Sequence, residues 1–154
     1  MDNEQPSQEE RTMAALAHGS VVLFGMGVVA AIVLWVTQKE KSRYVAFQAL
    51  QAVAYHIAGF AIFIVGMGCW LALYFISFIP LMTTPEESAG GALWIFLVAT
   101  FLMLVPFAQM GLWILGGAWG AVRTLQGKDF HYVVIGRYLE RWLDKSPAGG
   151  DTSD

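Results

Sequence analysis

Four aromatic and amide side chains recur at helical spacing in a stretch that carries almost no charge. They are Tyr44, Gln48, Gln51 and Tyr55, which we call the polar stripe. On a helix that turns by about 100° per residue, they fall within about 40° of one another. An unpaired glutamine amide in hydrocarbon is costly. The polar stripe is therefore expected to face a bundle interior, another chain or the membrane interface.

Two histidines lie inside apolar runs, and neutral imidazole is a common ligand of metals and of b-type haem. His18 lies one turn into the first run and His56 about three turns into the second. Measured from the expected cytoplasmic surface, the helical rise places His18 at about 27 Å and His56 at about 18 Å. A shared ligand needs both imidazoles at one level. The sequence therefore favours structural histidines and predicts neither a metal nor a cofactor.

Gln109 is a polar residue in the third apolar run, three residues after Pro106. Proline has no backbone N–H and can leave carbonyls unpaired, so Gln109 is expected to make a structural hydrogen bond there. The alternative is a polar step in a permeation path, together with Thr100, Gln48 and Gln51. An ion path would ordinarily include a buried charge, and the expected spans contain none.

The inventory of reactive groups does not favour an enzyme. The sequence offers no paired carboxylates, no nucleophile beside a base at a plausible depth and no phosphate-binding glycine loop. Cys69 is the single cysteine, so an intrachain disulfide is excluded. No basic stripe is available for nucleic acid, although the formal net charge is only -3.

Composition and hydropathy point to an all-α integral membrane protein. Of the 154 residues, 56% are apolar and only 14% charged. Charge-free runs at about 13–36, 45–82 and 92–122 predict three transmembrane helices, because about twenty apolar residues cross a hydrocarbon core about 30 Å thick. The second run is long enough for two short spans with a turn at 66–68. One long helix is preferred, since loop backbone is not tolerated in lipid.

The basic residues predict an orientation in the cytoplasmic membrane. The connection after the first run and the segment after the third are basic, whereas the loop "TTPEESAGG" has no Lys or Arg. The positive-inside rule then places the first connection and the C-terminus in the cytoplasm. The N-terminus and the acidic loop are expected outside.

The ends of the chain differ from the membrane domain, which is expected to cover 11–145. Residues 1–10 and 146–154 are polar and are predicted to be disordered tails. A C-terminal amphipathic helix is predicted over about 131–145, and it should lie flat at the interface or pack against a partner or the first connection. Its apolar and basic faces include Tyr138, Trp142, Arg137 and Arg141.

Three segments also carry a family resemblance, which runs from about Glu10 to Trp142. They read "ERTMAALAHGS", "KSRYVAFQALQAVAY" and "GKDFHYVVIGRYLERW". In this order the chain resembles a widespread bacterial family of small membrane proteins of unknown function, related to the twenty-kilodalton Tic protein of the chloroplast inner-envelope translocon. Members often have histidine in place of Gln48 and proline in place of Val133. The resemblance implies a compact helical membrane fold and, through the plastid relative, a part in protein import.

Two functions remain open after these observations. The first is a non-enzymatic interaction or assembly subunit of a larger membrane complex, and the alternative is a translocation or permeation component. Small residues four apart, such as Gly116 and Gly120, allow close helix packing within the chain or with a partner. The expected partners are the lipid bilayer and either another membrane protein or a second copy of this chain.

Overall fold

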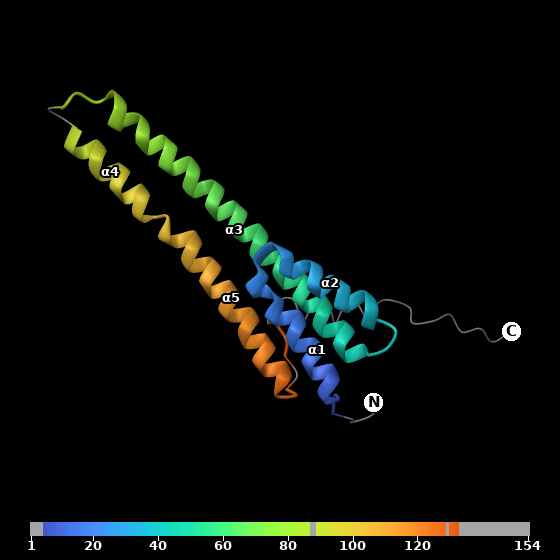
Figure 1. The fold of residues 1–154 in the computed structure, drawn as a ribbon. Helices are drawn as coiled ribbons and strands as arrows, with labels where there is room; N and C mark the ends of the chain where they lie inside the picture. Colours follow the sequence, from blue (N-terminus) through green and yellow to red (C-terminus); the bar gives the residue numbers. More distant parts are fainter. Residues whose placement is uncertain (1–4, 87–88, 129, 133–154) are drawn as a thin grey trace. The chain divides into compact units, whose positions relative to one another are not determined.

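The computed structural model describes residues 5–86, 89–128 and 130–132, and nearly all of them are helical (Figure 1). The elements are α1 (Gln8–Gly19), the 3-10 helix η1 (Ser20–Met26), α2 (Gly27–Gln38), α3 (Arg43–Thr83), α4 (Ala89–Phe101) and α5 (Leu104–Leu125). The chain divides into unit 1, formed by Met1–Ile57 and Gly116–Asp154, and unit 2, formed by Ala58–Leu115. The protein is all-α, as predicted.

Three helical segments are long and apolar enough to cross a membrane by length and composition. They are Gln8–Gln38, Arg43–Thr83 and Ala89–Leu125. They correspond to the three predicted spans. The predicted C-terminal amphipathic helix, with Tyr138, Trp142, Arg137 and Arg141, and the tail 146–154 fall almost wholly on 133–154, outside the described residues.

Helix α1 begins at a capping box. The Ser7 hydroxyl accepts from the Glu10 amide at 3.2 Å, and the Glu10 carboxylate accepts from the Ser7 amide at 2.8 Å. These two bonds satisfy backbone donors that the first turn of a helix leaves free. The helix therefore includes residues 8–10, which the sequence analysis assigned to the disordered tail.

The first apolar run is a helical hairpin rather than one straight helix. The chain turns within η1, where Phe24 has the non-helical angles φ 53° and ψ -131°. Helices α1 and α2 then lie side by side (Figure 1). Ala17 and Ala31 meet in the buried core of unit 1, although fourteen residues of continuous helix would separate them by about 21 Å. The expectation of a single straight span at 13–36 is corrected accordingly.

The hairpin brings its two ends together. Ser42, just before α3, donates a hydrogen bond from its hydroxyl to the Glu10 carboxylate. The start of α1 and the basic connection between α2 and α3 therefore lie at the same end of unit 1. This contact does not agree with an N-terminus on the side opposite to that connection, because that expectation assumed one straight crossing. The sequence does not indicate this turn, because the residues around Phe24 are themselves apolar.

The second and third runs follow the expected pattern more closely. Helix α3 is continuous over 41 residues, so the run is one long helix without a turn at 66–68. The third run is broken between Phe101 and Leu104, where the Met103 and Val105 amides bond carbonyls only three residues back, at 3.1 Å each. Pro106 cannot donate to the carbonyl four residues before it, which accounts for the expected kink.

Candidate functional site

The two glutamines of the polar stripe are buried in unit 1. Gln48 is 1% and Gln51 0% exposed. Their side-chain amides both donate to the Phe130 carbonyl at 3.2 Å, and the Gln51 side-chain carbonyl accepts from the Tyr132 amide at 3.1 Å. Of the three surroundings that the sequence allowed, the stripe thus faces the bundle interior. We call these glutamines, His18, Phe130 and Tyr132 the polar cluster.

His18 connects the hairpin to this cluster. Its Nε2 lies 3.0 Å from the Gln48 side-chain oxygen, and its Nδ1 lies 3.2 Å from the Tyr132 hydroxyl. Because the Gln48 oxygen can only accept, Nε2 carries the proton and Nδ1 accepts from Tyr132. His18 is thereby satisfied as a neutral imidazole. It is a structural histidine bonded to neighbouring segments, as the sequence favoured.

The phenol of Tyr132 keeps its proton in this environment. Burial raises the pKa of Tyr132 well above its ordinary value, and the adjacent Tyr55 raises it further. The rings of Tyr55 and Tyr132 stack with centroids 4.1 Å apart and an interplanar angle of 4°. Of the two aromatic members of the polar stripe, Tyr55 therefore contacts the cluster. Tyr44 is half-buried at the start of α3.

His56 supports the turn of the hairpin. Its Nε2 lies 3.1 Å from the Ser20 hydroxyl and 3.4 Å from the Ala17 carbonyl. The same hydroxyl is within hydrogen-bond distance of the Ala17 and Gly27 carbonyls, at 2.8 and 2.9 Å. These contacts bridge the end of α1 and the start of α2. His56 and His18 thus contact different partners.

Glycines in α5 provide the space into which the cluster packs. A Cβ added at Gly117 would lie 2.6 Å from the Val21 side chain, and one at Gly120 would lie 2.9 Å from the Phe130 ring. At Gly116 an added Cβ would collide with the Tyr55 hydroxyl. The small residues at this spacing therefore serve close packing within the chain.

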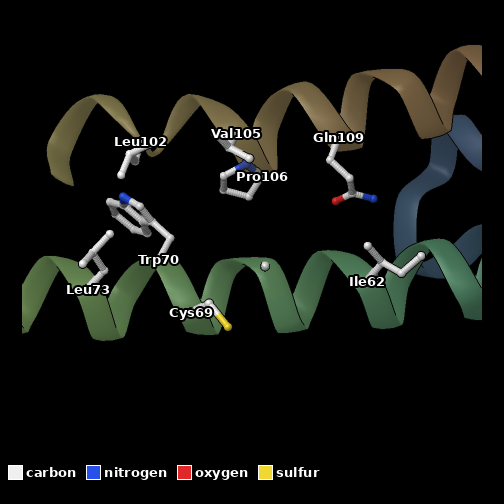
Figure 2. A pocket seen from close by; sticks show the side chains of 9 residues that line it. Ile62, Cys69, Trp70, Leu73, Leu102, Val105, Pro106 and Gln109 are labelled. Carbon is white, nitrogen blue, oxygen red and sulfur yellow. The ribbon is translucent and has the colours of Figure 1, made fainter. Parts of the chain in front are cut away.

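The cluster is suited to structural bonding. Its members are neutral amides, an imidazole, a phenol and backbone groups that bond one another. Within residues 5–86, 89–128 and 130–132, the structure shows no group of three or more His, Cys, Asp or Glu side chains that could hold a metal ion. Gln109 belongs to unit 2, where it lines an apolar groove (Figure 2). Its side-chain oxygen makes no hydrogen bond with the described residues, so the structural bond expected beside Pro106 is not found for that atom.

Sequence reasoning did not find the contribution of Phe130 and Tyr132. Residue 131 was assigned to the start of an interfacial helix, whereas residues 130–132 have no regular secondary structure and bind the two glutamines through the backbone. The available signal was that Gln48 and Gln51 needed partners. Nearly every residue has a backbone carbonyl and amide, so the sequence does not indicate which of them bind the glutamines.

The comparisons with known proteins identify a family. No curated protein and no solved structure matches the chain. One family model matches residues 9–139, and it describes the magnetosome magnetite crystal formation protein family. The match agrees with the expected small membrane-protein family, and the expected relation to the chloroplast Tic protein stays a prediction. Because the matched segment covers most of the sequence, the chain belongs to the MamF/MmsF magnetosome magnetite crystal formation protein family.

Proposed function

We propose that this protein is a non-enzymatic subunit of the magnetosome membrane, which acts in magnetite crystal formation by assembling with other membrane proteins. Family membership supports the process and the membrane, and members of this family are not known as enzymes. The observation that supports a role in assembly is the exposure of large apolar side chains, since the polar stripe is bonded within the chain. Its glutamines bind residues 130–132 of the same chain.

This internal bonding argues against a permeation path through unit 1. A path would need polar groups that line open space and exchange ligands with a passing solute. Gln48 and Gln51 are instead buried and already bonded, and His18 uses both ring nitrogens. The same bonds occupy the side-chain oxygen and nitrogen of both glutamines, which are therefore not available to dock a partner.

Apolar helix faces remain for contact with lipid and with partner helices. Large hydrophobic side chains are widely exposed in both units. Examples are Val22 (65%), Met26 (67%), Trp94 (70%), Phe101 (71%) and Leu112 (70%). Apolar surface on this scale is typical of membrane or protein contact sites rather than of a monomer in water. Association of such faces in a bilayer depends on close packing.

Three parts of the chain lie at one end of unit 1, and this end is proposed to face the cytoplasm. The start of α1 contacts Ser42, and the Arg11 guanidinium lies so near Gly127 that an added Cβ would be 2.6 Å from its Cζ. Lys39, Lys41 and Lys128 are close in sequence to these points. The positive-inside rule, applied to this end as a whole, puts it on the cytoplasmic side.

The experiment that tests the proposed function removes and then restores the protein in magnetite-forming cells. Electron microscopy measures crystal size, and native mass spectrometry of the tagged protein, extracted in mild detergent, measures its assembly. We expect altered crystals without the protein, restored crystals with it, and a defined complex heavier than one chain. Unchanged crystals, or a monomer that fully restores them, would contradict the proposal.

A further inference from the structure

Unit 2 contains an apolar groove between α3 and the broken third run (Figure 2). Its volume is about 390 Å³. This lies within the range of small-molecule sites, about 300–1,000 Å³. On α3 the groove extends from Ile62 to Leu73, and on the facing run it extends from Leu102 to Gln109.

The groove is open because two facing residues, Gly66 and Pro106, leave space between the helices. Gly66 has no side chain, and a Cβ added there would still lie 4.0 Å from Pro106. Pro106 sits just after the helix break at 102–103, where the regular backbone bonding of the run is interrupted. A kink opposite a glycine leaves space that neighbouring side chains do not occupy.

A single buried acceptor lies in this groove without a partner. The Gln109 side-chain oxygen is buried and makes no hydrogen bond with any of the described residues. Figure 2 shows this side chain extending from α5 into the space towards α3. The Trp70 indole N–H already donates to the Ala99 carbonyl at 2.9 Å. A buried oxygen left in this state is costly, so a ligand that brings a donor gains affinity there.

The dimensions of the groove fit one hydrocarbon chain. Ile62 and Leu73 are eleven residues apart on α3, which corresponds to about 16 Å along the helix. A volume of about 390 Å³ over that length gives a mean cross-section of about 24 Å². One extended hydrocarbon chain fills such a cross-section. A helix, at least about 10 Å across, does not fit.

We propose that this groove binds a single-chain lipid whose hydroxyl group donates a hydrogen bond to the Gln109 side-chain oxygen. The hydroxyl lies at the Ile62 and Gln109 end, and the hydrocarbon chain runs along Gly66 and Pro106 towards Leu73 and Leu102. The apolar walls supply most of the affinity, and Gln109 selects the polar end. This ligand site is independent of the proposed assembly function.

The test compares two probes that differ in one donor. A long-chain alcohol brominated along its chain and its methyl ether are titrated into the purified protein in detergent. Bromine quenches nearby tryptophan fluorescence, and the Trp70 signal is the difference between the natural protein and Trp70→Phe. We expect the alcohol to bind about three- to tenfold more tightly than the ether, which cannot donate. In Gln109→Leu the two probes should bind equally.

Two glycine variants provide the matched control. Gly66→Leu places a side chain in the groove and should abolish quenching of Trp70 by the alcohol. Gly68→Leu, two residues away, has open space and should leave quenching unchanged. Equal affinity of alcohol and ether in the natural protein would overturn the proposal without any variant. So would equal quenching in Gly66→Leu and Gly68→Leu, since the bromine would then reach Trp70 from detergent outside the groove.

Discussion

At the scale of single residues, Gln48 and Gln51 determine where residues 130–132 lie. Three hydrogen bonds join the glutamines to the Phe130 carbonyl and the Tyr132 amide. A buried glutamine whose side-chain N–H and carbonyl are both bonded fixes the positions of its partners. Any other arrangement of these groups leaves donors and acceptors unpaired. His18 extends the bonding from α3 to α1. The polar cluster thus joins three parts of the sequence at one place.

Removing one partner from this cluster should destabilise the protein. Gln48→Leu leaves the proton on His18 Nε2 without its acceptor and removes one donor to Phe130. We expect the free energy of unfolding to fall by about 1–3 kcal/mol, the usual effect of an unpaired buried polar group. Thermal unfolding in detergent, followed by circular dichroism, measures this. Gln126→Leu, at an exposed glutamine beyond α5, is the control and should change stability by less than about 0.5 kcal/mol.

A double substitution separates bonding from packing. If His18→Ala and Gln48→Leu act on the same bond, their combined effect should be smaller than the sum of the single effects by about 0.5–3 kcal/mol. The measurement is the unfolding free energy of the four proteins in the same detergent. Strictly additive effects would show that the 3.0 Å contact between His18 and Gln48 contributes nothing to stability.

At the scale of elements, the hairpin of α1, η1 and α2 changes how the chain relates to the membrane. Hydropathy identifies the run correctly as apolar, and a straight helix would cross the bilayer. Phe24 instead turns the chain back, with Ser20 and His56 bonded at the turn. A run of apolar residues does not reveal such a turn, because hydropathy reports transfer into lipid and not backbone angles.

The turn depends on Gly27. A Cβ at this position would lie 2.8 Å from the Ser20 carbonyl carbon and would collide with its oxygen. Gly27→Ala should therefore cost about 1–3 kcal/mol of stability, as overpacking typically does. Gly19→Ala is the matched control, since its Cβ would meet Ala121 at an ordinary 3.7 Å. Equal stabilities of the two variants, measured by thermal unfolding, would contradict the close approach of Ser20 and Gly27.

The hairpin also predicts which ends share a side of the membrane. In a Cys69→Ala background, cysteines introduced as Gln5→Cys and Lys41→Cys should react with a membrane-impermeant maleimide from the same side. The physical reason is the Glu10 and Ser42 contact at one end of unit 1. Labelling in sealed vesicles of known orientation tests this, with detergent-opened vesicles as the control. Protection of one position while the other reacts would contradict the hairpin and favour a straight first span.

The sequence alone predicted the helical class, the three apolar segments and the kink near Pro106, because hydropathy and proline chemistry act locally. It was also predictable that Gln48 and Gln51 need hydrogen-bond partners, because they lie in an apolar run. Their partners at Phe130 and Tyr132 were not, since they are backbone groups about eighty positions away. The groove beside Gln109 needed the structure as well, because it depends on which residue of α3 faces Pro106.

At the scale of the whole molecule, polar and apolar side chains have opposite roles. The glutamines of the polar stripe bind residues 130–132 of the same chain, and the exposed apolar faces are proposed to contact lipid and partner proteins. The proposed assembly would act in magnetite crystal formation, the process that the family description names. The central claim is therefore that partners are contacted through the apolar faces and not through the polar stripe.

Photocrosslinking from two aromatic positions tests this claim most directly. A benzophenone amino acid replaces either Trp94, which is 70% exposed, or Tyr55, which stacks on Tyr132. Irradiation in native membranes is followed by mass spectrometry of the adducts. We expect adducts with another membrane protein from position 94, and adducts within the chain, at residues near 132, from position 55. Adducts with another protein from position 55, and none from position 94, would contradict it.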